Sequence, residues 1–153
     1  MYKLQPFKLM FIDNKDYDFP IRGGAKMAMI FIDYKTRFKT KLDLTLKVNN
    51  GNAFAQIVSM TGAHNLDYPC RVLSDGCGSM AHVKTMATRM GIDHAYIPPR
   101  QQSLNKAEKV ADQMWAAARG HVIHTQAPNA VFTLAVDYPL YVDARTAATD
   151  TRS

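Results

Sequence analysis

Cysteine and long apolar runs are both scarce in this chain of 153 residues. Two cysteines, Cys70 and Cys77, are too few for a disulfide framework or a four-ligand zinc site. No apolar run approaches the roughly 18 residues of a membrane helix, and no charged-then-apolar leader is recognisable. Only His121 and His124 lie close together among the histidines, and their spacing fits the surface end of a helix better than a metal site. These absences favour an intracellular protein without a structural zinc site.

The sequence also has no obvious Ser-His or Cys-His pair for nucleophilic catalysis. It does have an excess of basic charge, because 19 Lys and Arg stand against 13 Asp and Glu and give a net charge of +6. This balance indicates a polyanionic partner, with nucleic acid ahead of an anionic membrane. The length and a hydrophobic share of 47% suit one globular domain with its own core.

Hydrophobic periodicity predicts three strands at the start of the chain. The apolar run over 7–13 is typical of a central strand buried on both faces, and it ends on Asp13. A second strand is expected over 25–34. Strict alternation over 38–48 predicts a half-buried third strand at a sheet edge. Its basic residues are expected on the solvent face as edge protection: Lys39, Lys41 and Lys47.

The rest of the chain alternates helices with strands. Helices are expected over 52–61, 79–90, 103–118 and 129–147, and strands over 71–75 and 94–97. Ser79 and Ser103 are the expected helix starts, and the last helix is expected to bend near Pro139. The order β-β-β-α-β-α-β-α-α predicts an α/β fold, a five-stranded mixed sheet with helices on both faces. We expect one domain over 7–147 and a disordered tail over 148–153.

The third helix has an apolar stripe that we expect to pack on the sheet. The stripe contains Leu104, Ala107, Val110, Ala111, Met114 and Ala118. Trp115 is expected in the core beside it.

Three carboxylates can meet at one edge of this sheet. Asp13 and Asp75 each end an apolar strand, and neighbouring parallel strands would bring both to the same edge. Glu108 is placed in the second turn of the long helix, from which it can lean over the strand ends. Three carboxylates suit Mg²⁺ or Mn²⁺, and two such ions can drive in-line displacement at a phosphate. A plainer interpretation stays open, in which the two aspartates cap turns and the glutamate is solvated.

Three blocks occur in the order found in one family. Residues 71–79 read Arg-Val-Leu-Ser-Asp-Gly-Cys-Gly-Ser, and residues 90–99 read Met-Gly-Ile-Asp-His-Ala-Tyr-Ile-Pro-Pro before Gln101 and Gln102. Residues 31–38 read Phe-Ile-Asp-Tyr-Lys-Thr-Arg-Phe. Together they resemble the catalytic core of copia-type (Ty1/copia) retrotransposon integrases, within the retroviral integrase superfamily. The resemblance covers about residues 7–147.

The resemblance implies a ribonuclease-H-like fold and a catalytic triad of Asp13, Asp75 and Glu108 that binds two Mg²⁺ or Mn²⁺ ions. Asp75 lies 62 positions after Asp13, and Glu108 lies 33 positions after Asp75, close to the family's spacing. Asp16 and Asp18 remain open as the first ligand. Asp33 matches a family position that is not catalytic.

The implied activity is that of a polynucleotidyl transferase, which processes DNA 3′ ends and inserts them into target DNA, with nuclease activity as a side reaction. Partners would be element ends, target DNA and further copies of the chain as a homodimer or higher oligomer, and no membrane. Residues before and around Glu108 would contact DNA phosphates: Arg100, Gln101, Gln102, Asn105, Lys106 and Lys109. An ordinary solvated helix start is an equally weighted alternative. In a eukaryote the location would be the nucleus or a cytoplasmic element particle.

One departure from the family lies just before the glutamate. Ser103-Leu-Asn-Lys106 stands where the family has an Asn-Gly approach, which predicts a stiffer loop and lower activity. Complete integrases also carry an N-terminal zinc domain and a C-terminal DNA-binding region, so the chain is expected to be an isolated core or polyprotein fragment. One alternative is a decayed or domesticated core that binds nucleic acid or protein. Another is an unrelated ribonuclease-H-like nuclease.

Overall fold

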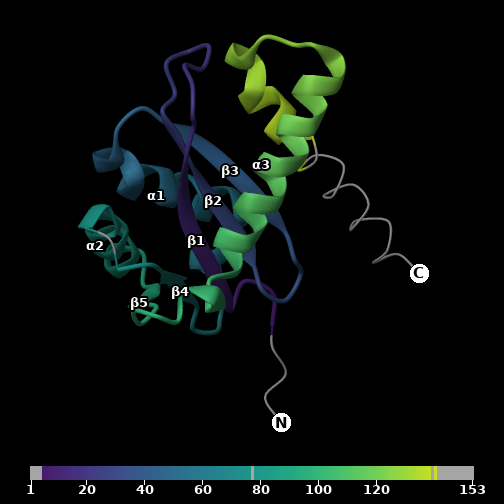
Figure 1. Ribbon diagram of the computed structural model, residues 1–153. Coiled ribbons are helices and arrows are strands. Elements are labelled where there is room, and N and C mark those ends of the chain that lie inside the picture. Colours follow the sequence, from purple (N-terminus) through teal and green to yellow (C-terminus); the bar gives the residue numbers. More distant parts are fainter. Residues whose placement is uncertain (1–4, 77, 139, 141–153) are drawn as a thin grey trace.

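A five-stranded mixed sheet forms the centre of the protein, as the computed structural model shows for residues 5–76, 78–138 and 140 (Figure 1). The strand order is β3-β2-β1-β4-β5. β1 pairs antiparallel with β2 and parallel with β4. The strands are β1 (Leu9–Asp16), β2 (Met27–Asp33), β3 (Lys39–Leu44), β4 (Arg71–Ser74) and β5 (Asp93–Tyr96). The predicted mixed sheet, with β3 at an edge, is confirmed.

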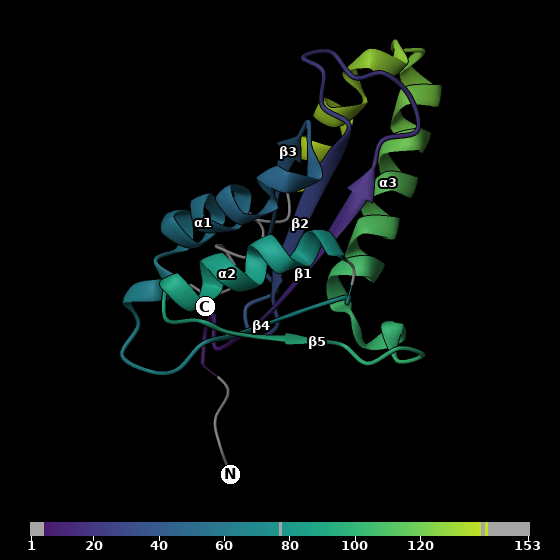
Figure 2. The same ribbon diagram turned by 90° about the vertical axis from the view of Figure 1, so that its left-hand side faces the viewer.

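Helices cover both faces of this sheet, also as predicted. They are α1 (Asn50–Thr61), α2 (Ala81–Arg89) and α3 (Lys106–Thr125). α1 and α2 lie on one side and α3 on the other (Figure 2). A further helical segment over 132–138 packs beside α3. Within the described ranges, no helix has the length and apolar character needed to cross a bilayer.

The sheet separates two hydrophobic cores. Side chains alternate along β1, so Met10 and Ile12 pack toward α1 and α2, whereas Phe11 packs toward α3. Every residue of β2 is buried, as expected for a strand covered on both faces. The predicted core residues Met114 and Trp115 are 5% and 1% exposed, which confirms them.

α1 and α2 approach each other closely at Gly51. A Cβ atom at this position would lie 2.9 Å from the carbonyl oxygen of His82, so a larger residue would force the two helices apart. The predicted end of this helix at residue 61 is confirmed, and Gly62 caps it with φ 69°.

The expectation that the lysines of β3 lie on a solvent face is wrong for Lys41. Lys41 is opposite Ile30, whose side chain belongs to the core under α3. Only 3% of the Lys41 side chain is exposed. The helical segment over 132–138 covers this end of the sheet. The local sequence pattern around Lys41 cannot predict this burial, because the covering segment lies about 90 residues later in the chain.

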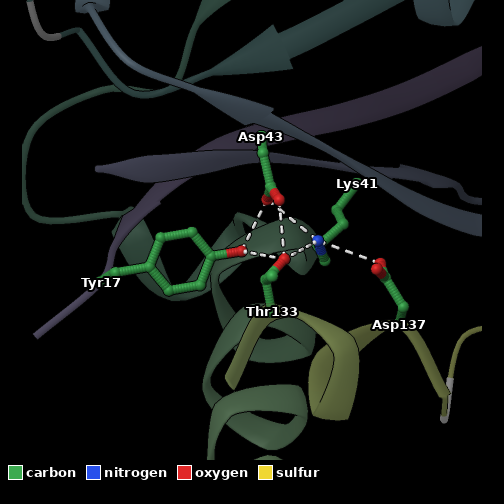
Figure 3. A network of polar contacts seen from close by, with 5 residues as sticks. All are labelled: Tyr17, Lys41, Asp43, Thr133 and Asp137. Atoms are coloured by element: carbon green, nitrogen blue, oxygen red, sulfur yellow. Dashed lines mark hydrogen bonds and ion pairs between the residues drawn. The ribbon is translucent and has the colours of Figure 1, made fainter. Parts of the chain in front are cut away.

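Lys41 is the centre of a polar network (Figure 3). Its Nζ donates to Thr133 Oγ1 at 2.8 Å and lies 2.9 Å from Asp43 Oδ1 and 3.0 Å from Asp137 Oδ1. Tyr17 Oη donates to Asp43 Oδ1 at 2.6 Å. The network therefore connects the 132–138 segment to β3 and to Tyr17, directly after β1, and we expect it to be structural.

Several predicted boundaries were wrong. β3 ends at Leu44 rather than at 48, because the chain turns there into a 3-10 turn and α1. α2 follows a 3-10 turn over Gly78–Met80, so Ser79 is not its cap. α3 begins at Lys106 rather than at 103, which leaves Leu104 in a preceding turn and 53% exposed instead of on the apolar stripe.

The C-terminal predictions are tested only in part. Residues 129–131 form a 3-10 turn and 132–138 a helix. The predicted bend at Pro139, the rest of the helix over 141–147 and the tail over 148–153 lie outside the described residues, as does Cys77.

Candidate functional site

Asp13 and Asp75 occupy matching positions on neighbouring parallel strands. Phe11 of β1 is opposite Leu73 of β4, so two further residues along each chain bring Asp13 level with Asp75. The prediction that the strand ends on Asp13 is wrong, because the pairing of β1 with β2 continues to Asp16. The pairing with β4 does end before it. Asp13 therefore lies where β1 leaves its parallel neighbour, on the face that carries Phe11 and α3.

Glu108 is the third residue of α3, in its first turn rather than its second. A carboxylate here is stabilised by the free N–H groups at the start of the helix. Asp112, four residues later, lies on the same flank of the helix and accepts from Lys15 Nζ at 2.8 Å. Lys15 is two residues beyond Asp13 on the same face of β1. This contact turns the Glu108 flank of α3 toward β1.

The three acids interact electrostatically. Burial, then the charge of Asp75, and more weakly that of Glu108, raise the pKa of Asp13 to about 7, although the Asn14 backbone and Lys15 oppose the shift. Across the described part of the chain, no three His, Cys, Asp or Glu side chains already sit close enough to ligate one ion. The effect of Asp75 and Glu108 on the pKa of Asp13 places the acids near enough to repel one another. A cation would have to draw them closer together to be bound by all three.

Asn105 connects the three elements that carry these acids. Its Oδ1 accepts from the Ala107 amide at 3.0 Å and caps α3. Its Nδ2 lies 3.3 Å from both the Ile12 carbonyl and Asp75 Oδ1. Only 1% of the residue is exposed. The resemblance predicts that Asn105 contacts DNA, but the structure places its side chain inside, where it positions Asp75.

A serine next to Asp75 in the chain forms a hydrogen-bonded pair with a histidine. Ser74 Oγ lies 2.7 Å from His94 Nε2 and donates to the Asp75 carbonyl at 3.2 Å. Burial and the nearby charge of Lys84 lower the pKa of His94, so this ring is neutral at pH 7. No sequence pattern predicts this Ser-His pair, because the two residues lie 20 positions apart on β4 and β5. Because Ser74 is fully buried, it is no accessible nucleophile.

The other acids near the start of the chain lie elsewhere. Asp33 is fully buried, and its carboxylate accepts from the Phe7 amide and from the amide and hydroxyl of Thr36. It therefore stabilises the turn after β2. Asp16 is exposed at the end of β1, and Asp18 lies 3.9 Å from Arg119.

The remaining candidates for DNA contact surround the start of α3. Arg100 and Gln101 are exposed in the turn before it, and Arg100 has a left-handed backbone with φ 70°. Lys106 is half-buried and Lys109 exposed. Of Gln102, the structure describes only the backbone, in the 3-10 turn before the helix.

Replacing Asn105 by alanine is expected to cost about 1–2 kcal/mol of stability, because α3 loses its cap and the Ile12 carbonyl loses a partner. Urea denaturation at pH 7.5 measures the change. Asn65→Ala, at an exposed position, is the matched control and should change stability by less than about 0.5 kcal/mol. Equal stability of the two variants would contradict the connecting role of Asn105.

Comparison with known proteins gives structural but not sequence matches. No protein-family model and no curated protein sequence matches the chain. Among solved structures, a chain of the simian T-cell lymphotropic virus intasome in complex with PP2A regulatory subunit B56 gamma superposes with a TM-score of 0.66 at 12% identity. The match covers 89% of this protein and 49% of that chain. This protein thus spans about half of that chain's length.

Two structures of the HTLV-2 integrase catalytic core domain in complex with magnesium also match. The trimeric form gives a TM-score of 0.64 at 13% identity, with 92% of this protein and 86% of that chain covered. The dimeric form gives 0.63 at 14%, with 90% and 86% covered. At these identities the likeness establishes the fold, which is the ribonuclease-H-like fold of integrase catalytic cores.

Proposed function

We propose that this protein is the catalytic core of a DNA integrase of the copia type, a polynucleotidyl transferase with Asp13, Asp75 and Glu108 as its catalytic residues. The observation that carries the proposal is the level placement of Asp13 and Asp75 on parallel strands, with the Glu108 flank of α3 turned toward them. The fold shared with integrase cores supports it.

The donor set fits a pair of Mg²⁺ or Mn²⁺ ions, because carboxylate oxygens are the ligands that these ions prefer. Burial and then the charges of Asp75 and Glu108 raise the pKa of Asp13, and a bound cation would offset both effects. Bound ions would supply Lewis-acid activation of the attacking oxygen and stabilise the leaving one. The magnesium in the two HTLV-2 cores supports this choice of metal.

The chain's own residues would bind and orient the substrate. Arg100, Lys106 and Lys109 would bind phosphates of the DNA around the start of α3, with Gln101 and Gln102 alongside. Asn105 and Ser74 would hold the carboxylate and the backbone of Asp75 in place. Substrates would be element ends and target DNA, and the active form a homodimer or higher oligomer.

The test is incubation with Mn²⁺ and a branched DNA that mimics the integration product, followed by gel analysis of the released strands. We expect Asp75→Asn and Glu108→Gln each to lower the rate by more than the roughly 10- to 100-fold that loss of an outer partner of a metal site costs. Asp67→Asn, an exposed loop variant, is the control and should retain activity. A wild-type protein without activity, or triad variants as active as the control, would overturn the proposal.

A decayed core that only binds nucleic acid is the second candidate. The observation that favours it is the absence of a ready-made ligand cluster among the described acids. It predicts DNA binding by the wild type without strand release in the same assay.

A further inference from the structure

A basic hollow lies on the opposite flank of α3 from Glu108. Its volume is about 370 Å³. Four cationic side chains line it, two from the turn and strand after β2 and two from the start of α3: Arg37, Lys39, Lys106 and Lys109. Gln113 adds an amide, and no acid is among the lining residues that the structure describes.

The two flanks of α3 follow from its geometry. At about 100° per residue, Lys106 and Gln113 lie nearly in line, while Glu108 lies on the far side of the buried stripe. Lys106 and Glu108 are thus on opposite edges of the contact between α3 and the sheet. One edge faces Asp13 and Lys15, and the other faces the β2–β3 turn.

Three of the four cationic side chains of this hollow have no ion pair with a described residue. No carboxylate within the described ranges forms an ion pair with Arg37, Lys106 or Lys109. Arg37 lies over the Tyr34 ring, with its guanidinium carbon 5.0 Å from the ring centre. It also has a left-handed backbone with φ 62°, which is uncommon for a residue other than glycine. The like charges repel, so an anion bound among them would be stabilised strongly.

We propose that this hollow binds a backbone phosphate of nucleic acid, a few nucleotides from the position where the triad would act. This rests on the proposed function for the placement of the scissile bond. The planar guanidinium of Arg37 suits bidentate phosphate binding, and the lysines add point charges. A helix with its side chains is about 10–12 Å across. About three nucleotide steps of about 3.4 Å each would span this width. A strand crossing the start of α3 would therefore contact both flanks.

A larger hollow elsewhere on the protein does not share this chemistry. It has a volume of about 580 Å³ and lies at the β1–β2 connection. Asp16 and Asp18 line it together with Lys26 and Lys47. Because its charges have both signs, it provides a matched control for the loss of two positive charges.

The experiment measures binding of a fluorescein-labelled DNA duplex by anisotropy, in EDTA and over a series of KCl concentrations. The test variant is Arg37→Asn/Lys109→Gln, in which asparagine also suits the left-handed backbone at position 37. We expect affinity to fall about 10-fold and the slope of log K against log salt to become shallower by about 1, the value for one lost phosphate contact. The control Lys26→Gln/Lys47→Gln should stay within about 2-fold of the wild type, with its slope unchanged.

Thermal melting of every variant guards against misfolding, because a variant that melts like the wild type can lose affinity only through its changed side chains. Equal losses in the test and control variants, an unchanged slope in the test variant, or a wild type that does not bind DNA would overturn the phosphate site. If instead the hollow behaves as expected while the branched-DNA assay shows no strand release, only the proposed catalytic function fails.

Discussion

Asp13→Asn is expected to stabilise the protein by about 2–4 kcal/mol at pH 8 in the absence of divalent metal. The variant keeps the shape of the side chain but removes a charge that burial, Asp75 and Glu108 all disfavour. Urea denaturation in EDTA measures the difference. Such a gain from loss of a proposed catalytic group would be a stability–activity trade-off.

The sign of the effect follows from proton linkage. The pKa of Asp13 is about 7 in the folded protein, above its ordinary value of 3.8, so the folded state holds a proton that the unfolded state has lost between these values. Stability therefore falls as the pH rises through this window. Above pH 7 the buried charge of Asp13 lowers the stability by at most about 4 kcal/mol, which is the free-energy equivalent of the difference between the two pKa values. The advantage of Asp13→Asn should shrink as the pH is lowered toward 4.

Asp16→Asn is the matched control, because Asp16 is exposed at the end of the same strand. It should change stability by less than about 0.5 kcal/mol at either pH. If Asp13→Asn proved no more stable than Asp16→Asn at pH 8, Asp13 would not carry a destabilising charge.

Metal should reverse the advantage of the variant. Mg²⁺ or Mn²⁺ that binds only the folded protein stabilises it in proportion to the logarithm of its concentration above the Kd. We expect the melting temperature of the wild type to rise with added metal, and that of Asp13→Asn to change much less. An equal response of both proteins would place the bound metal away from Asp13.

The sheet could be predicted from the sequence because its signals are local. Alternation over 38–48 shows the strand period directly, and the short apolar runs before Asp13 and Asp75 are typical of buried strands. The order of elements then requires the parallel pair. Once β1 and β4 are neighbours, the level placement of the two aspartates follows. The catalytic assignment of Asp13 remains a prediction, although its proximity to Asp75 could be foreseen.

The supporting residues could not be predicted because their partners are distant in sequence. Asn105 contacts the Ile12 carbonyl from 93 positions away, and its role depends on where the chain turns before α3. A serine and a histidine became neighbours only through the pairing of β4 with β5. In both cases the polar residue looks like any loop or strand residue until the fold is known.

Lys41 shows the same limit most clearly. Polar residues such as lysine alternate along the strand in the same way whether water or another segment of the chain covers that face. Here the cover is the helical segment over 132–138, which brings Thr133 and Asp137 to the Nζ atom. The edge of the sheet is thus protected by a specific polar contact as well as by charge.

Lys41→Met is expected to destabilise the protein by about 2–3 kcal/mol at pH 7. Removing one partner of a fully buried ion pair costs about 3–5 kcal/mol, and the loss here is smaller because water can reach the remaining acids. The side chains of Asp43 and Asp137 are 32% and 52% exposed, against 3% for Lys41. Urea denaturation measures the change, with Lys35→Met at an exposed turn position as the control.

The acid side of the stability profile separates loss of the ion pair from loss of packing. Although burial raises it, hydrogen bonds from Thr133, Tyr17 and Lys41 lower the pKa of Asp43 below its ordinary value on balance. Its contribution to stability is therefore present at neutral pH and is lost as the pH falls through that lowered pKa. Lys41→Met should weaken this acid-dependent loss, and limited proteolysis should cut near 132–138 sooner. A variant as stable as Lys35→Met would show that the network adds nothing to the attachment of that segment.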